Sequence, residues 1–196
     1  MKINSYLVAF LLAITVISCK ENTTQKMEKT TSSSHAALAH LQALGDSCSK
    51  AWDMMISSDD QKIKDLERLL QEISYIPGHN EQELARLSKL VKELPSKRYT
   101  PATMTSPAID AYDQTTDEVL RQVFELKSNT KGVENYTLTS ELEMSIREAD
   151  GMVVNYRVLY DRWVHQYNES LDKIQTTTEV SDKDREGLDK KMTFEI

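Results

Sequence analysis

A continuous helical pattern near the C-terminus is the feature that most constrains the fold of this chain. From Leu138 to Ile174 there is no proline and a single glycine, Gly151, and apolar or aromatic residues recur at steps of three and four. These residues occupy positions 142, 146, 149, 153, 156, 160, 163, 167, 171 and 174. The spacing is close to a heptad repeat, which places all of them on one stripe of a helix roughly 55 Å long. Other helices must bury a stripe of that length, so the pattern predicts an elongated helical bundle.

Four shorter amphipathic helices are predicted before this long one. Their expected limits are 36–56, 58–73, 80–94 and 106–126. Ser58 and Asn80 each begin a capping-box pattern, and Ser106 is an expected N-cap followed by a proline in the first turn. Glycine and proline are scarce, and strand patterns are almost absent. We therefore expect an all-α fold, an elongated antiparallel bundle of about five helices with one long C-terminal helix as its spine.

The N-terminus resembles the signal peptide of bacterial lipoproteins. Lys2 precedes an apolar run from Tyr6 to Ile17, which is too short to cross a bilayer comfortably. The run ends in Val16-Ile17-Ser18-Cys19, which resembles a lipobox. The resemblance implies that diacylglycerol is attached to the Cys19 sulfur and that the chain is cut before this residue. The alternatives are an ordinary secretory signal with an incidental cysteine and an uncleaved anchor.

The rest of the chain divides by composition into three parts. Residues 19–35 are polar without an apolar period and are expected to form a flexible tether. Residues 36–175 form the expected helical-bundle domain, which is long enough to bury a sizeable core. Residues 176–196 form a polar C-terminal tail, which we expect to be disordered or frayed as far as Lys191.

Charge and cysteine content narrow the possible partners. The formal net charge of −7, without a basic stripe, argues against nucleic acid, whose binding depends on neutralising phosphates. The same charge opposes anionic lipid headgroups, so the acyl chains on Cys19 are the expected link to the membrane. Once Cys19 is acylated, Cys48 has no partner for a disulfide, and we interpret it as a small buried residue.

A motif in the long helix is similar to the C-terminal signature of the LemA family, R-x-x-Y-N-x-x-V-x-x-Y-N. The matching residues are Arg157, Tyr160, Asp161, Val164, Tyr167 and Asn168. Ala51-Trp52 resembles an alanine–tryptophan step of that family, whereas its R-R-x-D-L-I-P segment has no counterpart in this chain. The resemblance lies mainly in residues 142–168. It implies an envelope-anchored helical bundle with no established enzymatic activity.

The same helix carries the candidate interaction residues. They are Arg157, Tyr160, Asp161, Trp163, Tyr167 and Asn168. Tyrosine, tryptophan and arginine are enriched at interface hot spots, so this rim could bind a peptide or another envelope protein. The competing interpretation is a tyrosine-rich core stripe beside a solvated charged flank.

No catalytic or metal-binding pattern is recognisable in the sequence. There is no glycine-rich phosphate loop, no G-x-S-x-G elbow, no Glu-x-x-His pair and no zinc-ligand spacing. Met54 and Met55 near Cys48 are better explained as core filler than as copper ligands. We therefore expect no enzyme, no cofactor and no metal. The favoured function is a lipid-anchored interaction or scaffolding module of the cell envelope, with its domain in the periplasm or at the cell surface. The alternative is a periplasmic carrier of a small apolar ligand.

Overall fold

The structure is a computed structural model that describes residues 21–178 and 180–194, with side chains described from residue 33 onward. Its elements are α1 (Glu21–Ser74), α2 (Glu81–Glu93), η1 (Leu94–Lys97), α3 (Ser106–Asn129), η2 (Val133–Asn135), α4 (Thr137–Gly151), α5 (Val153–Thr176) and α6 (Asp182–Arg185). The described residues contain no strand, and the all-α fold predicted from the sequence is confirmed.

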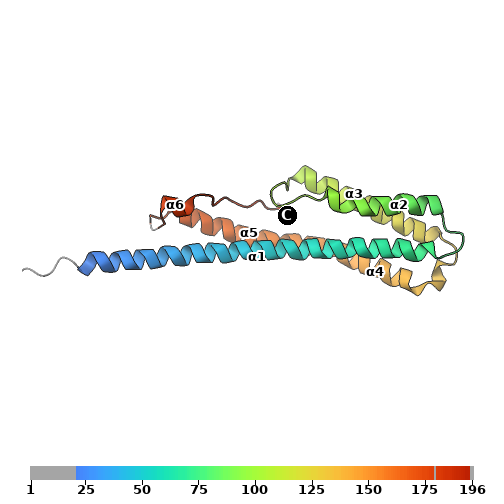
Figure 1. The fold of residues 1–196 in the computed structure, drawn as a ribbon, viewed down its shortest axis with the longest axis horizontal. Coiled ribbons are helices and arrows are strands. Elements are labelled where there is room, and N and C mark those ends of the chain that lie inside the picture. Colours follow the sequence, from blue (N-terminus) through green and yellow to red (C-terminus); the bar gives the residue numbers. More distant parts are fainter. Residues whose placement is uncertain (1–20, 179, 195–196) are drawn as a thin grey trace, which may run out of the picture.

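The molecule is an elongated antiparallel bundle built on α1 (Figure 1). Helix α2 runs back along the distal part of α1, and α3 returns beside α2. Helices α4 and α5 then follow one another along α1, whose N-terminal part extends beyond them, and α1 contacts both of them extensively. The site described below lies where these long helices pass one another in the middle of the rod.

The predicted long C-terminal helix is present but bent at Met152, between α4 and α5. The Met152 N–H donates to the carbonyls of Glu148 and Ala149 at 3.1 and 3.3 Å, and the Met152 carbonyl accepts from Tyr156 N–H at 3.1 Å. The hydrogen-bond ladder therefore continues through the bend, next to the glycine at position 151. Six of the ten predicted stripe positions are buried (142, 146, 160, 167, 171 and 174). The other four are half-buried: 149, 153 and 156 lie around the bend, and 163 lies further along α5.

Two predictions about α1 are wrong. No helix boundary occurs at Ser58, because α1 continues unbroken to Ser74. Asp59 and Asp60, which follow Ser58 in the predicted capping box, instead pair with Arg98 of another segment, as described below. The polar residues 21–34 are also helical, although the sequence predicts no helix in that part of the tether. The segment contains no proline, so nothing removes a bond from the helical ladder.

The predicted helix starts are closer to the structure. Asn80 is the N-cap of α2, and its side chain accepts from the backbone N–H of Glu83 at 3.0 Å. Helix α3 begins one residue earlier than expected, because Thr105 rather than Ser106 provides the capping oxygen for the backbone N–H of Ala108. Both caps satisfy amide groups that have no partner within their helix.

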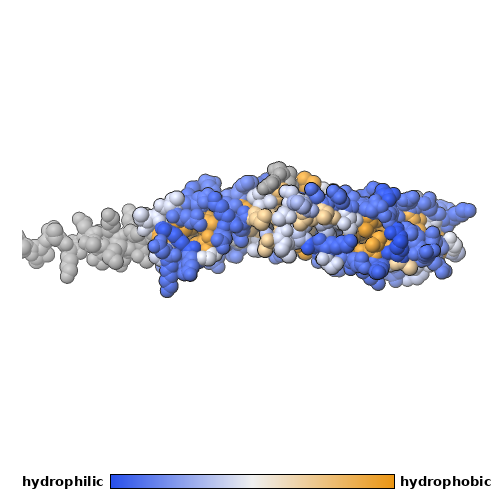
Figure 2. All heavy atoms as spheres, turned by 90° about the horizontal axis from the view of Figure 1, so that it is seen from above, coloured by the Kyte–Doolittle hydropathy of each residue, from blue (hydrophilic) through white to orange (hydrophobic). Residues whose placement is uncertain are grey.

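The core consists of two separate apolar clusters. The aliphatic cluster lies between α2, α3, α4 and the C-terminal part of α1, and comprises Ile63, Leu66, Leu69, Leu70, Ile73, Leu87, Val91, Leu94, Val119, Leu120, Val123, Leu126, Leu142 and Ile146. The aromatic cluster lies between α5 and an earlier part of α1, and comprises Leu41, Leu44, Cys48, Ala51, Trp52, Met55, Tyr99, Met104, Ile109, Tyr112, Tyr160, Val164, Tyr167, Leu171, Ile174, Val180 and Phe194. Hydrophilic side chains cover most of the face seen in Figure 2, with hydrophobic areas separated by a paler middle stretch.

The expected disordered tail is instead a strap that crosses the aromatic cluster. We use "strap" for residues 177–178 and 180–194, which include α6 and turn back along α5 (Figure 1). Val180 and Phe194 are 3% and 7% exposed, so both belong to the core. The polar composition of this segment concealed these two anchors, and the prediction of a frayed tail is wrong.

Candidate functional site

A layer of polar side chains separates the aliphatic cluster from the aromatic cluster. Asp59 and Lys62 supply it from α1, and Thr116 supplies it from α3. Asp150 adds a carboxylate from the end of α4, close to the bend of the long helix. Helices α1, α3 and α4 therefore each place polar side chains at the same level of the rod.

Asp59 is the centre of this layer and is 7% exposed. One of its oxygens accepts from Arg98 Nε at 2.6 Å and from the Tyr112 hydroxyl at 2.5 Å. Its other oxygen lies 3.2 Å from Lys62 Nζ. Lys62 is only 2% exposed and also contacts Asp150 at 3.0 Å. The four charged groups form one chain across the interior, which keeps each of them compensated.

Burial and charge fix the protonation of this network. Burial raises the pKa of Tyr112, and the negative charge of Asp59 with its hydrogen bond raises it further. The phenol therefore stays protonated and donates to Asp59. Burial works against the charge of Arg98, but the hydrogen bond to Tyr112 and the pairing with Asp59 and Asp60 raise its pKa overall. Arg98 remains a cation throughout the physiological range.

Arg157 forms a second, half-buried pair beside the first. Its guanidinium bonds both oxygens of Asp113 at 2.6 and 2.7 Å, which is the bidentate geometry that arginine favours. It also donates to the hydroxyl of Tyr99 at 3.0 Å. On its other side the guanidinium carbon lies 5.2 Å from the centre of the Phe194 ring. Arg157 thus links α3, the loop after η1 and the end of the strap.

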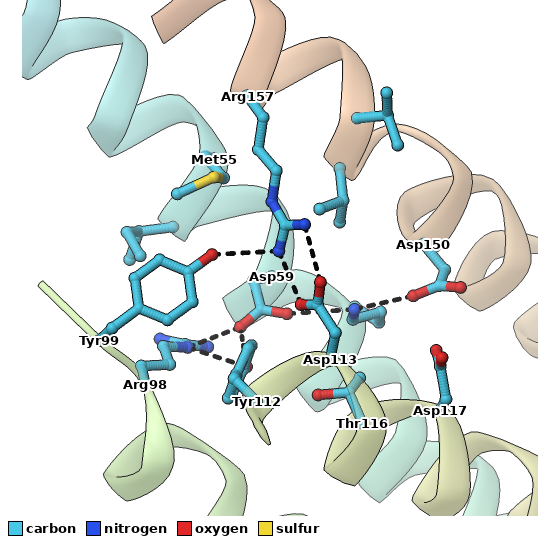
Figure 3. A pocket seen from close by; sticks show the side chains of 14 residues that line it. Met55, Asp59, Arg98, Tyr99, Tyr112, Asp113, Thr116, Asp117, Asp150 and Arg157 are labelled. Atoms are coloured by element: carbon cyan, nitrogen blue, oxygen red, sulfur yellow. Dashed lines mark hydrogen bonds and ion pairs between the residues drawn. The ribbon is translucent and has the colours of Figure 1, made fainter. Parts of the chain in front are cut away.

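These residues surround a cavity of about 200 Å³. Figure 3 shows the charged side chains converging on it from α1, α3, α5 and the loop that carries Arg98 and Tyr99. Its apolar wall is formed by Met55, Ile56, Val153 and Val154. Since a water molecule occupies roughly 30 Å³ in the liquid, the space could hold about six waters or one small organic molecule.

Three buried polar atoms at the cavity have no hydrogen-bond partner among the described residues. They are Thr116 Oγ1, Arg98 Nη2 and Arg157 Nε. Thr116 is 4% exposed, and Figure 3 shows its hydroxyl turned inward, to the side of Tyr112. The neighbouring Thr115 hydroxyl instead donates to the carbonyl of Ala111 at 2.7 Å, as helical threonines commonly do. The Thr116 hydroxyl is therefore left for something other than the protein.

The structure brings only one of the six candidate interaction residues into the cavity wall. That residue is Arg157. Tyr160, Asp161 and Tyr167 are 2%, 8% and 8% exposed, and Trp163 packs half-buried against the aromatic cluster. These four side chains belong to the core and do not form an open rim.

Several of the candidate residues bind a peptide segment, which is the chain's own strap. An Asp161 oxygen accepts from the backbone N–H of Phe194 at 2.8 Å. The side-chain amide of Asn168 bonds both the N–H and the carbonyl of Lys191, each at 2.9 Å. The Phe194 ring stacks on Trp52 and meets Tyr160 edge-on, with centroids 6.1 and 5.5 Å away. Cys48, also beneath this region, is a free buried thiol whose pKa is raised by burial.

Sequence reasoning missed the residues that define the cavity. The predicted cap at Ser58 treats Asp59 and Asp60 as part of a helix start, and no sequence pattern marks Lys62, Thr116 or Asp150 as lining a cavity. A signal did exist, because on α1 the apolar stripe stops at Met55 and resumes at Ile63. Nothing in the sequence, however, shows that the interruptions on three helices coincide in space.

The polar groups that line the site differ in how far they are already engaged. The carboxylates of Asp59 and Asp113 are engaged by cations or by a phenol, so neither is free to accept a proton from a substrate. No group of three metal-ligating side chains occurs in the part of the chain that the structure describes. The site offers a small cavity with fixed charges, hydroxyl groups and an apolar wall.

Comparison with known proteins supplies no relative for this chain. No family model, no curated protein and no solved structure matches it. Among the described helices, none has an apolar stretch that would span a bilayer.

Proposed function

We propose that this chain is a lipid-anchored protein of the bacterial cell envelope whose helical bundle binds a small molecule without transforming it. The observation that carries the binding role is the cavity in the polar layer, with the buried, unpartnered hydroxyl of Thr116 in its wall. A hydroxyl without a partner in the interior costs about 1–3 kcal/mol, and a bound ligand would remove that cost.

The charge network beside the cavity supports the same role. Pairs buried as deeply as Asp59 with Lys62 seldom add net stability, because desolvation of both groups offsets their attraction. Apolar side chains in this layer would have joined the aliphatic and aromatic clusters into one core. A binding site that needs fixed charges explains why the two clusters are kept apart.

The cavity can be tested with a pair of neighbouring threonines. Native mass spectrometry of protein purified from its own host should show a bound small molecule that Thr116→Val reduces. Thr115→Val is the matched control, because its hydroxyl is satisfied within α3. Retained ligand in Thr116→Val would remove Thr116 from the site.

A second variant tests whether the ligand occupies the cavity, by filling part of the cavity volume with a larger side chain. Val153→Phe replaces an isopropyl group in the cavity wall with a larger phenyl ring and should exclude the ligand. Val158→Phe, at an exposed position on the same helix, should not. If thermal melting shows both variants folded and neither differs from the parent in bound mass, the cavity is not the binding site.

The membrane anchor is proposed from the sequence alone. Cys19 and the signal peptide lie outside the described residues, and the predicted diacylglycerol at Cys19 is what would hold the protein to a membrane. Intact-mass analysis of the native protein should show loss of residues 1–18 and the added mass of acyl chains. A Cys19→Ala variant should lose both. An unprocessed, unacylated native chain would contradict the anchor and the envelope location together.

The LemA-like interaction module is the second candidate function. Val154 and Val158 are 56% and 42% exposed and lie one turn apart on α5, where a partner protein could cover them. Crosslinking in intact cells should then capture one envelope partner, and Val158→Glu should abolish the crosslink while the fold is kept. An unchanged crosslinking pattern would rule out this face.

A further inference from the structure

The charges around the cavity are not balanced, and this imbalance indicates what kind of ligand fits. Four carboxylates line it, from Asp59, Asp113, Asp117 and Asp150, against three cations, from Lys62, Arg98 and Arg157. Each cation is already paired with one of the first two carboxylates, and Lys62 also contacts Asp150. Each lining cation therefore has a carboxylate partner, although Arg98 Nη2 and Arg157 Nε keep N–H groups without an acceptor, and negative charge remains in excess.

The surplus carboxylate is at the edge of the cavity. Asp117 is exposed on α3 and makes no hydrogen bond or ion pair among the described residues. Asp150 is bound to Lys62 through a single oxygen, and its side chain is 37% exposed. Figure 3 shows these two carboxylates on the same side of the cavity, turned toward one another. A positive group between them would be held by two opposite charges.

Deeper in the cavity the surfaces suit a carbon skeleton and one polar substituent. Met55 and Val153 provide apolar contact, and the Tyr99 and Tyr112 side chains also line the space. The unpartnered hydroxyl of Thr116, 4% exposed, supplies an independent polar contact away from the acidic edge. The volume of about 200 Å³ is below the roughly 300–1,000 Å³ of drug-sized pockets, so the ligand must be small.

We propose that the cavity binds a small organic ammonium compound, with its amino group between Asp117 and Asp150 and its carbon skeleton against Met55 and Val153. The assignment rests on the proposed binding function and specifies the ligand for the same site. An anionic ligand would place like charge beside Asp117 and Asp150. A metal ion would lack a third ligand, since no group of three metal-ligating side chains occurs among the described residues.

Three probes with one carbon skeleton separate charge from shape. Cyclohexylamine, cyclohexanol and cyclohexanecarboxylate are titrated into the purified full chain at pH 7, and binding is followed by calorimetry and by ligand-observed NMR. Cyclohexylamine should bind about tenfold more tightly than the carboxylate, with cyclohexanol in between, because only the amine complements the acidic edge.

Asp117→Asn is the informative variant, since the side chain is exposed and unpaired, so the substitution should leave the fold intact. The substitution should weaken the binding of cyclohexylamine about five- to tenfold and leave the affinity for cyclohexanol unchanged. Asp110→Asn, two turns earlier on α3 and also exposed, is the control that should change neither probe.

The outcomes distinguish the ligand class from the binding function. Equal affinity for the three probes, or tightest binding of the carboxylate, would overturn the ammonium assignment while the cavity remained a binding site. An Asp117→Asn variant that binds cyclohexylamine like the parent would overturn it as well. Binding of none of the probes, together with no bound mass in the native protein, would overturn both proposals.

Discussion

The aliphatic and aromatic clusters occupy one rod but are closed in different ways. The aliphatic cluster is enclosed by four helices, and all of its buried members are aliphatic hydrocarbon side chains. The aromatic cluster lies chiefly between α1 and α5, and it is completed by a loop and by Phe194 near the end of the chain. Its rings make six pairwise contacts among Trp52, Tyr99, Tyr112, Tyr160 and Phe194.

The difference shows what each kind of packing requires. Aliphatic side chains need only close contact, which the packing of α1, α2, α3 and α4 against one another provides. Tyrosines bring hydroxyl groups that must find partners when buried, so they accompany the ion pairs of Arg98 and Arg157. The aromatic end therefore depends on protonation and on a distant segment of chain, whereas the aliphatic end depends on shape alone.

The largest effect is expected where the two regions meet. Asp59→Ala removes the carboxylate that compensates Lys62, Arg98 and the Tyr112 hydroxyl. Leaving buried charges unpaired should lower the free energy of unfolding by about 3–5 kcal/mol, measured by urea denaturation followed by circular dichroism.

The control for this variant lies on the same helix. Asp53 is exposed on α1, and Asp53→Ala should change the free energy of unfolding by less than about 0.5 kcal/mol. If Asp59→Ala were no more damaging than Asp53→Ala, the polar layer would not couple the two clusters.

A smaller effect is expected at alkaline pH, where the aromatic cluster should lose stability and the aliphatic cluster should not. Burial, followed by the nearby Cys48 and Asp161, raises the pKa of Tyr160 to about 12, whereas an unfolded tyrosine titrates near 10. Between these values the unfolded chain loses a proton that the folded chain keeps. The stabilisation is therefore complete below pH 10 and is lost as the pH rises to 12, by about 2–3 kcal/mol from this residue.

Tyr160→Phe should remove the share of the alkaline loss that belongs to Tyr160, whereas Tyr112, whose pKa burial also raises, keeps its own share. Denaturant titrations at pH 9 and pH 11.5, followed by tryptophan fluorescence, measure the change, since Trp52 belongs to the aromatic cluster. Tyr75→Phe is the control, because Tyr75 is 56% exposed and belongs to neither cluster. The same alkaline loss in Tyr160→Phe and the parent would contradict burial as the source of the raised pKa.

The sequence predicted the parts of the fold that depend on local periodicity. The stripe from Leu142 to Ile174 and the cap at Asn80 could be found because neighbouring residues along one helix determine them. The bend at Met152 lies beside the one glycine in the long pattern, but neither the bend nor the cavity near it is visible in the period itself.

The site could be predicted only in part, because it is made by contacts across the chain. Asp59 meets Arg98 and Tyr112 over separations of 39 and 53 residues. Asp59 beside Asp60 has the local appearance of a helix start, and only the tertiary partners decide otherwise. Phe194 likewise stands in a polar segment, where no period marks it as a core residue. Aromatic residues outside any amphipathic pattern are therefore worth testing as long-range anchors.

The smallest effect is expected from the strap, although its anchor is a large aromatic ring. If the strap could not detach from the helices, Phe194→Ala would lower the free energy of unfolding by about 3–5 kcal/mol. The strap lies at the chain end and can detach while the helices stay folded, so the loss cannot exceed its docking free energy, which we expect to be about 1–2 kcal/mol. Leu66 lies in the aliphatic cluster on α1, which cannot detach by itself, so Leu66→Ala should lower the free energy of unfolding by about 2–5 kcal/mol.

Hydrogen exchange separates these two kinds of loss. In Phe194→Ala the amides of Lys191 and residue 194, which bond to Asn168 and Asp161 in the parent, should exchange much faster, while Val91 keeps nearly its parent protection. A chain that ends at residue 176 should be no less stable than Phe194→Ala, because both leave the same helices without the docked strap. If truncation instead lowered the protection of Val91 as strongly as Leu66→Ala does, the strap would be part of one cooperative core, and the aromatic end would be no more separable than the aliphatic end.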